Sequence, residues 1–272
     1  MSSAPAAAAL PDRRMQRVEV YVLAPAAGAG GGAPLLLPGT GGPRVPGAVL
    51  GHGELPRSAA VRALGGALGD DRTLAGRLRA RRVLSDVRPQ GPGPGMHVLR
   101  LVLAGHDVDP GLVDPGLLRE PDPVPPAPAA LPGAPRRVQR PAAYALVVRT
   151  GEVLLSRVSG FGSWTLPGGG IDHGEHPEQA VRRETVEETG LELASADLID
   201  VDSRRFTGRS PAHVTEDFHG VRILYRGTVT DRRDPVVQEV GGTTDAAAWV
   251  ALDRLAELRL TDIARTALTA AS

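Results

Sequence analysis

Runs of apolar residues separated by turn-forming residues predict a sheet in the second half of the chain. Two of these runs, 142–148 and 153–158, flank Thr150 and Gly151, a pair typical of a hairpin turn. Further apolar runs predict strands at 198–206, 221–229 and 246–250 and closing helices at 252–258 and 262–270. Strands and helices mixed in this order predict an α/β fold in which helices cover a mixed sheet.

A helix is predicted between the hairpin and the later strands. Residues 177–189 read PEQAVRRETVEET and are mostly strong helix formers. Pro177 stands in the first turn, where its missing N–H has no intrahelical partner to lose. Gly190 follows at the position where a residue with a left-handed backbone ends many helices. The glycine-rich turn 167–170 comes directly before this segment.

A stretch rich in proline and alanine, 121–135, divides the chain near its middle. Proline removes a backbone donor and its ring clashes inside helices and strands, so this stretch predicts a semi-rigid extended linker. We therefore predict three parts: a first domain at 15–118, a linker at 119–139 and a second domain at 140–272.

Composition limits the kind of protein. The chain has 272 residues, 42% of them apolar, which is enough for two domains with cores of their own. Basic and acidic residues balance at 31 each, which argues against a nucleic acid or an anionic membrane as partner. The absence of cysteine excludes disulfides, thiolate metal sites and thiol nucleophiles. With no signal-peptide pattern and no apolar run of about 18 residues, we predict a cytoplasmic protein.

The chain also carries an internal repeat. A shift of 121 residues aligns 46–69 with 167–190, and nine of the 24 aligned positions are identical. With small changes of shift the agreement extends outward, so that Arg17, Tyr21, His97, Arg100 and Gly105 fall on Arg140, Tyr144, His219, Arg222 and Gly227. Shared composition bias is the alternative explanation. A tandem duplication accounts better for identities that keep their order along the chain.

Seven residues between 169 and 191 stand at a spacing that indicates metal chemistry. The pattern G-x5-E-x7-R-E-T-x-E-E-x-G-L contains Gly169, Glu175, Arg183, Glu184, Glu187, Glu188 and Gly190. The last three glutamates stand at i, i+3 and i+4, so their carboxylates share one helical face. Three like charges this close repel, and a hard divalent cation with oxygen ligands relieves the repulsion.

This segment resembles the Nudix box, and the resemblance covers most of 140–272. It implies the Nudix α/β/α sandwich and hydrolysis of a pyrophosphate linkage by water attack on phosphorus. Thr185 departs from the pattern, which usually has an aliphatic residue there. Glutamates that only decorate a solvated helix are the alternative, and the glycine turn, Glu175 and Arg183 at fixed spacing favour the metal site.

Site residues follow from the box and from the resemblance. We predict Mg²⁺, with Mn²⁺ as a substitute, held by Gly168, Glu175, Glu184, Glu187 and Glu188. Family members differ in their general base, so Glu187, Glu188, Glu216, Asp217 and Glu239 stay open, with the order of preference Glu187, Glu216, Glu239. Arg157 and Arg222 are candidates for binding phosphate oxygens, or ordinary surface arginines. Trp164, Phe206 and Phe218 either stack on a base or belong to the core.

Several substrate classes remain open. The chain lacks the active-site cysteine that resemblance to the isoprenoid-isomerase branch would require and the extra motif of the coenzyme-A branch. It also lacks the proline soon after the box that would suggest ADP-ribose specificity, since the first proline downstream is Pro211. Nucleoside triphosphates, nucleotide sugars and related diphosphates remain. A non-catalytic nucleotide-binding sensor or scaffold is the alternative function.

The first domain is predicted to be a degenerate copy of the second. Under the shift, Ala63, Gly66 and Ala67 replace Glu184, Glu187 and Glu188, whereas counterparts of Glu175 and Arg183 are kept as Glu54 and Arg62. We expect this copy to depend on the second domain for stability and to occupy the place of a dimer partner. The chain would then be a monomer with an internal pseudo-dimer, with a homodimer as the alternative.

Overall fold

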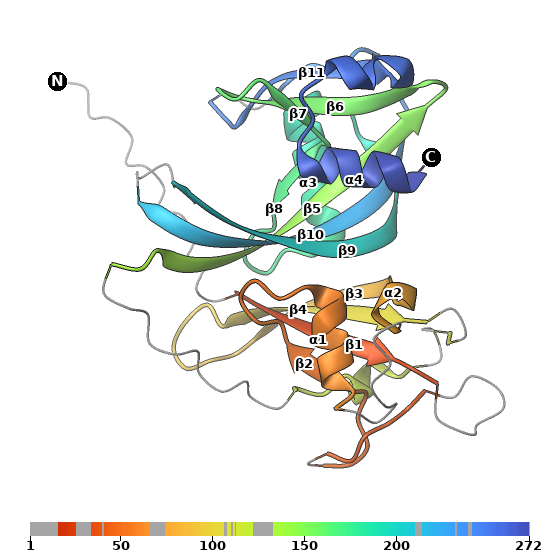
Figure 1. Cartoon of the computed structure of the whole chain (residues 1–272), viewed down its shortest axis with the longest axis vertical. Coiled ribbons are helices and arrows are strands. Elements are labelled where there is room, and N and C mark those ends of the chain that lie inside the picture. Colours follow the sequence, from red (N-terminus) through yellow and green to blue (C-terminus); the bar gives the residue numbers. More distant parts are fainter. Residues whose placement is uncertain are drawn as a thin grey trace.

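The computed structural model describes residues 16–25, 34–39, 41–65, 74–105, 108–109, 111, 113–121, 133–209, 214–231, 233–238 and 241–271. Gly66, Ala67, Pro211 and Glu239 lie outside these residues. Two sheets with their helices form an N-terminal unit, residues 16–121, and a C-terminal unit, residues 133–271. The C-terminal unit lies above the N-terminal unit in Figure 1, with the long strands of the upper sheet facing the lower sheet.

The N-terminal unit is built on a 4-stranded sheet with the order β2-β1-β4-β3. Its strands are β1 (Gln16–Leu23), β2 (Gly47–Val49), β3 (Arg79–Arg88) and β4 (Met96–Ala104). Strands β1 and β4 are parallel, and the other two pairs are antiparallel. Its helices are α1 (Pro56–Ala63), α2 (Leu74–Arg77) and the 3-10 turn η3 (Pro115–Leu117).

The C-terminal unit is built on a 7-stranded sheet with the order β11-β6-β5-β10-β9, in which β7 pairs with β6 and β8 with β5. The strands are β5 (Arg136–Arg149), β6 (Glu152–Val158), β7 (Ser163–Thr165), β8 (Gly168–Gly170), β9 (Leu193–Arg209), β10 (Thr215–Val229) and β11 (Thr244–Ala251). Its helices are α3 (Pro177–Thr189), η4 (Leu252–Glu257) and α4 (Asp262–Ala271).

Helices cover both faces of the second sheet. Ala180 and Val181 of α3 belong to the same buried cluster as Ala143 on β5. Ile263 of α4 instead packs with Leu146, whose side chain lies on the opposite face of β5 because side chains alternate along a strand. The predicted α/β/α sandwich with a mixed sheet is confirmed, and it places α3 beside the turn formed by β8.

The predicted elements of the second half are found, with changes at their ends. The helix at 177–189 and the hairpin turn at Gly151 are confirmed. Strands β9 and β10 are longer than predicted, because they continue to pair with each other beyond the apolar residues that signalled them. The segment predicted as a helix at 252–258 is the 3-10 helix η4.

Residues at both ends of the predicted linker, 119–139, contact the two units. Residues 136–139 belong to β5 and pair with 216–219 of β10, so the upper sheet begins before residue 140. At the other end, the Tyr21 hydroxyl donates to the carbonyl of Arg119 at 2.9 Å, which keeps that residue on the N-terminal unit. Residues 122–132 of the proline-rich stretch lie outside the described part of the chain.

The two sheets share not only strand order but also register. Tyr21 pairs with Gly47 as Tyr144 pairs with Gly168. Gln16 pairs with His97 as Gln139 pairs with His219, and Ser85 with Leu99 as Ser203 with Val221. The strand pairing therefore agrees with the internal repeat. Strands corresponding to β6 and β11 are not found among the described residues of the N-terminal unit.

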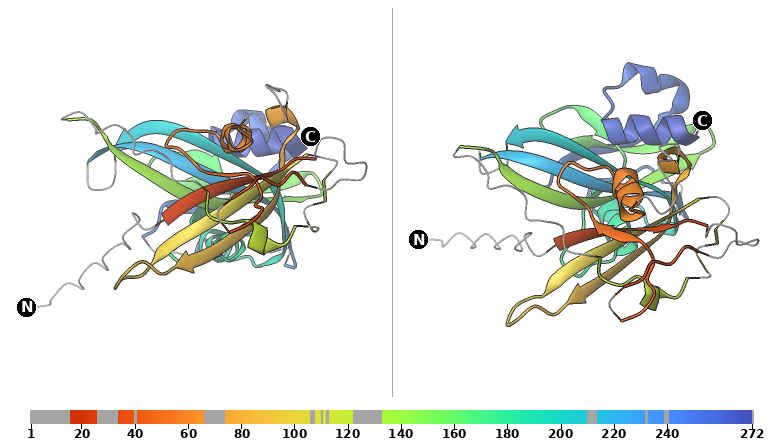
Figure 2. Two further views of the ribbon diagram at one scale, coloured as in Figure 1. Left: turned by 90° about the horizontal axis from the view of Figure 1, so that it is seen from below. Right: turned by 60° about the horizontal axis from the view of Figure 1, so that its bottom comes forward.

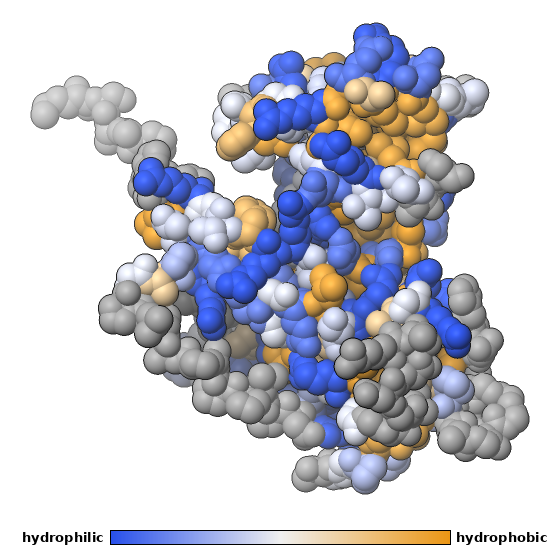
Figure 3. Space-filling view, viewed as in Figure 1, coloured by the Kyte–Doolittle hydropathy of each residue, from blue (hydrophilic) through white to orange (hydrophobic). Residues whose placement is uncertain are grey.

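One core joins the two units. Val18 and Val20 of β1 fall in the same buried cluster as Val221 and Ile223 of β10. Both views in Figure 2 show β1, β3 and β4 lying against the long strands β5, β9 and β10. On the face shown in Figure 3, hydrophilic surface gathers over the middle of the molecule, where β9 and β10 cross the view. Among the described residues, no helix combines the length and apolar character that crossing a membrane requires.

Candidate active site

Helix α3 is fixed at both ends by its own sequence. The His176 ring accepts from the Glu178 N–H at 3.2 Å, and the Gln179 side chain accepts from the His176 N–H at 3.0 Å. This capping box satisfies N–H groups that the first turn would otherwise leave without partners. At the other end Gly190 has a φ of 69° and donates its N–H to Val186 at 2.8 Å. The glutamates of the helix are therefore held on a defined face.

Arg183 connects the carboxylates of the box. Its guanidinium donates to both oxygens of Glu175, at 2.9 and 3.0 Å, and to the Gly170 carbonyl at 3.0 Å. It also donates to one oxygen of Glu184 at 2.8 Å and to one of Glu187 at 3.1 Å. The fork geometry of arginine lets one side chain orient three carboxylates. Arg183 therefore acts as a clamp within the cluster.

Burial and charge act in opposite directions on the box glutamates. Burial alone would raise the pKa of Glu175, but the hydrogen bonds from Arg183 and from the Asp172 N–H outweigh it, and the pKa lies below its ordinary value. For Glu184 burial dominates, and the charges of Glu188 and Glu187 add to it against Arg183, so its pKa rises to about 7. The cluster thus carries more negative charge than Arg183 alone neutralises.

Glu188 is the most buried of these glutamates, with 4% of its surface exposed. Its carboxylate accepts from the Gly168 N–H at 3.0 Å and from the Thr244 hydroxyl at 2.6 Å. Gly168 has a φ of 142°, and a Cβ there would lie 2.2 Å from the carbonyl oxygen of Ala143, so only glycine fits. The glycine turn therefore brings β8 against β5 and anchors Glu188 below it.

The donor set fits a hard divalent cation. Within the described residues no three acidic or histidine side chains already form a metal cage. Arg183 contacts one oxygen of Glu184 and one of Glu187, which leaves the second oxygen of each for a cation. A Cβ on Gly169 would lie 2.6 Å from the carboxylate of Glu184, so the glycine provides the space that this carboxylate occupies. All candidate ligands are oxygens, as Mg²⁺ and Mn²⁺ prefer.

Tyr144 and Arg222 lie beside this cluster. Arg222 of β10 pairs with Ala142 of β5, which in turn pairs with Gly170 of β8. The pKa of the half-buried Tyr144 is raised, first by burial and then by Glu188, while Arg222 opposes the shift. Arg222 forms an ion pair with Asp202 of β9. Tyr144 could not be identified from the sequence as a neighbour of the cluster, since a tyrosine in an apolar strand is typical of a core residue.

The other predicted arginine, Arg157, is held on β6 by an ion pair with Asp245 at 2.7 Å. Its guanidinium also lies 5.8 Å from the centre of the Trp164 ring. Asp245 directly follows Thr244, the residue that holds Glu188. Arg157 is therefore connected to the site through β11, and Trp164 is half-buried at its side.

Two of the candidate bases lie away from the box. Glu216 pairs with Arg136, eight residues before Tyr144 on β5, which corresponds to about 26 Å along the strand. It is buried and ion-paired with Arg136 and Arg140. Glu216 therefore cannot reach the carboxylates of α3, and the preference for it as second choice was wrong.

Asp217 follows Glu216 on β10, pairs with Arg137 of β5 and is held by Arg205. Hydrogen bonds from Arg205 lower the pKa of Asp217 to about 2, and His52 of the N-terminal unit approaches it at 3.2 Å. A carboxylate with this pKa is too weak a base to take a proton near neutral pH. Glu239 lies outside the described residues, and Glu187, with 39% of its side chain exposed, is in the cluster.

An aromatic pair lies further along the same strands. The rings of Phe206 and Phe218 are stacked with centroids 5.4 Å apart, and the Arg140 guanidinium lies 4.6 Å from the centre of the Phe218 ring. Phe206 is 52% exposed. These phenylalanines are therefore a surface feature of β9 and β10 and not part of the core.

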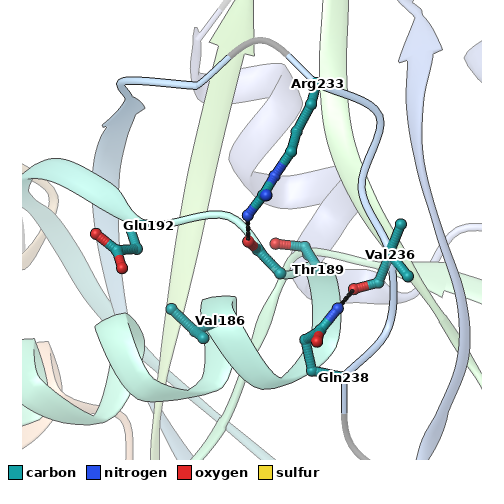
Figure 4. A pocket seen from close by; sticks show the side chains of 7 residues that line it. Val186, Thr189, Glu192, Arg233, Val236 and Gln238 are labelled. Carbon is teal, nitrogen blue, oxygen red and sulfur yellow. Dashed lines mark hydrogen bonds between the residues drawn. The ribbon is translucent and has the colours of Figure 1, made fainter.

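A pocket of about 420 Å³ lies at the C-terminal end of α3 (Figure 4). It is lined by Val186, Thr189, Gly190, Glu192, Arg233, Val236 and Gln238. Arg233 donates to the Gly190 carbonyl at 2.5 Å, and Gln238 donates its N–H to the carbonyl of Glu187 at 2.9 Å. The box carboxylates do not line this pocket, so it is separate from the Arg183 cluster.

Comparison with known proteins gives a family match within the C-terminal unit and several similar solved structures. A family model described as the NUDIX domain matches residues 138–270. A MutT NUDIX hydrolase from Burkholderia pseudomallei is 32% identical, with 49% of this chain and 98% of that one covered and a TM-score of 0.39. The NUDIX domain of NrtR from Shewanella oneidensis, solved with ADP ribose, is 20% identical, with 49% and 86% covered and a TM-score of 0.40.

Curated relatives match over a shorter segment. An RNA pyrophosphohydrolase from Tolumonas auensis is 56% identical over 43 residues, and one from Yersinia enterocolitica is 58% identical over 43 residues. Each match covers 16% of this chain and 25% of the relative. The chain thus spans about a quarter of the length of the curated relatives it matches.

Proposed function

Because the chain belongs to the Nudix family, whose model matches residues 138–270, we propose that its C-terminal unit hydrolyses a pyrophosphate bond in a nucleoside diphosphate derivative. The observation that carries this proposal is the cluster in which Arg183 joins three glutamates next to the glycine turn. A helix whose glutamates were only solvated would not bury Glu188 to 4% exposure beneath a glycine that no other residue can replace.

Glu184, Glu187 and Glu188 would hold the divalent cation, with the Gly168 carbonyl and Glu175 as further donors. A bound divalent cation supplies neutralisation of phosphoryl charge and activation of water. Among these three carboxylates that of Glu187 is the most exposed, and it takes the proton of the attacking water.

The same strands provide a surface for the rest of the substrate. Arg222 binds phosphate oxygens beside the cluster, in exchange with its present partner Asp202. Phe218 stands four residues before Arg222 on the same face of β10, about 13 Å away along the strand. That separation is comparable with the length of an extended nucleoside diphosphate, so the exposed Phe206 ring next to Phe218 can stack on the base.

A substrate panel tests the proposal. The full chain is incubated with nucleoside triphosphates, nucleotide sugars and dinucleotides in Mg²⁺ or Mn²⁺, and phosphate, pyrophosphate and nucleoside monophosphate are measured. Metal-dependent release of a phosphate-terminated product from at least one class is expected. Tight nucleotide binding without any product in either metal would instead identify a sensor or scaffold.

Replacing Gly169 by alanine should lower activity without unfolding the protein. The new Cβ would lie 2.6 Å from one oxygen of Glu184 and 2.8 Å from the other, so the carboxylate must move. Because this is the end of a flexible side chain, we expect kcat to fall about tenfold or more with little change in the melting temperature. Gly170→Ala is the matched control, since no atom lies within 4 Å of its Cβ. Equal activity of the two variants would contradict the role of Glu184.

Metal affinity should rise with pH up to about neutrality. Burial and the neighbouring glutamates raise the pKa of Glu184 to about 7 in the metal-free protein, so below this pH it must lose a proton to become a ligand. We expect Mn²⁺ affinity, measured calorimetrically, to fall about tenfold for each pH unit below 7. The same raised pKa makes the metal-free fold lose stability as pH rises from about 4.5 to 7. A pH-independent affinity would exclude Glu184 as a ligand.

A further inference from the structure

The loop between β8 and α3, residues 171–176, carries Glu175 and rests on the N-terminal unit. The Ser85 hydroxyl of β3 donates to the backbone carbonyl of Glu175 at 3.2 Å. Three further contacts hold the loop: Gln16 Nε2 donates to the Ile171 carbonyl at 3.0 Å, His173 Nε2 lies 3.0 Å from the Pro94 carbonyl, and His176 Nε2 lies 3.3 Å from the Val83 carbonyl. The active-site loop is thus held by the other half of the chain.

The same contacts occur a second time with the roles of the units exchanged. The Ser203 hydroxyl of β9 donates to the carbonyl of Glu54 at 2.9 Å, as Ser85 does to Glu175. Gln139 Nε2 donates to the Leu50 carbonyl at 3.4 Å, as Gln16 does to Ile171. These residues correspond to one another in the internal repeat and in strand register. Such reciprocity is the property of an interface between copies related by a two-fold axis.

Two histidine pairs repeat with nearly the same geometry. His97 and His173 face each other with ring centroids 5.6 Å apart and an interplanar angle of 71°. His52 and His219 have the same separation, 5.6 Å, and an angle of 73°. Each pair joins one residue of the N-terminal unit to one of the C-terminal unit. The two pairs are therefore related in the same way as the two serine contacts.

The N-terminal loop has kept its structure and its glutamate, whereas the helix after it lacks the glutamate that corresponds to Glu184. Arg62 donates to the two oxygens of Glu54 at 2.9 and 2.7 Å, as Arg183 does to Glu175. The Gly51 N–H donates to Glu54 at 2.8 Å, as the Asp172 N–H does to Glu175 at 2.9 Å. Ala63, however, stands where the C-terminal unit has Glu184. A loop that keeps these contacts beside a helix without the corresponding glutamate serves the interface.

Ser85 holds Glu175 in a defined way. Its hydroxyl has one hydrogen, which it donates to the Glu175 carbonyl, so it accepts from Nε2 of His97 at 2.8 Å. His97 is fully buried. The buried His97 ring therefore fixes the Ser85 hydroxyl, and this hydroxyl fixes the backbone of Glu175. Arg183 in turn joins Glu175 to Glu184 and Glu187.

We propose that the N-terminal unit is a degenerate copy docked in the place of a dimer partner, and that Ser85 is a positioning residue for the carboxylate cluster of the active site. The role of Ser85 in catalysis rests on the proposed function, whereas its role in holding the loop does not.

The matched variants Ser85→Ala and Ser203→Ala in the full chain test this proposal. Each variant removes one interface hydroxyl that donates to a loop carbonyl. Ser203 is the control because it contacts the N-terminal loop at Glu54, which is not part of the carboxylate cluster. For both we expect a similar drop of the melting temperature, by about 2–6 °C. Only Ser85→Ala should speed amide hydrogen exchange in 171–176, weaken MnCl₂ binding about tenfold and lower kcat about tenfold with KM unchanged. Ser85→Thr, which restores a hydroxyl, should recover these values.

The outcomes separate the two proposals. Equal effects of Ser85→Ala and Ser203→Ala on exchange and Mn²⁺ binding, or no effect of Ser85→Ala on either, would overturn the positioning role. If the wild-type chain hydrolyses no substrate, the proposed function fails, while exchange and Mn²⁺ binding still decide the role of Ser85. Should Ser85→Ala not fold, Gln16→Ala against Gln139→Ala makes the same comparison at a second reciprocal contact.

Discussion

Replacing Glu187 by glutamine should reduce kcat by at least ~100-fold while the fold is retained. Glu187 is 39% exposed and contacts Arg183 at 3.1 Å, so the amide can stay in place without burying an unsatisfied group. The lost charge weakens cation binding and removes the proposed base. The rate at saturating Mg²⁺ and the circular dichroism spectrum measure the two effects separately.

Glu188→Gln should be equally inactive and also less stable. The carboxylate oxygens accept from the Gly168 N–H and from the Thr244 hydroxyl, whereas an amide nitrogen accepts from neither, so the hydroxyl hydrogen of Thr244 loses its acceptor. A donor left unsatisfied at this buried position costs about 1–3 kcal/mol. Glu178→Gln on the same helix is the control, because Glu178 pairs with Arg182 outside the cluster. Full activity in chelator, or in both box variants, would refute the metal site.

The C-terminal unit expressed alone, as residues 136–272, should aggregate or pair with itself. Val221 and Ile223 of β10 share one buried cluster with Val18 and Val20 of β1, and removal of the N-terminal unit exposes this apolar face to water. The isolated unit also retains both the loop 171–176 and its reciprocal partner Ser203. Two copies can therefore dock across a true two-fold axis in place of the internal one.

Light scattering after size exclusion, at several protein concentrations, and binding of a dye specific for apolar surface measure this outcome. The full chain, which should remain monomeric over the same concentrations, is the control. A stable monomeric fragment with the kinetics of the full chain would show that the N-terminal unit contributes neither stability nor loop positioning.

Local sequence predicted the elements whose signals lie close together in the chain. The helix from Pro177 to Thr189 begins and ends as predicted, because its proline, capping residues and Gly190 act within one or two turns. The hairpin at Gly151 likewise depends on residues that are close in the chain. The contacts of Arg183 on α3 are also local, since its partners there stand one and four residues away. The internal repeat, visible in the sequence, also agrees with the register of both sheets.

Contacts between distant residues could only be decided by the tertiary structure. Spacing could not show that Glu216 lies at the far end of β5, since that depends on the register of β10. Nor could it show that Thr244 holds Glu188 across 56 residues or that Ser85 holds Glu175 across 90. The sequence by itself determined which groups the box contains and the helical face they share. Their burial, their charge balance and their support by the N-terminal unit arise from strand pairing and docking, because those fix the surroundings of each group in space.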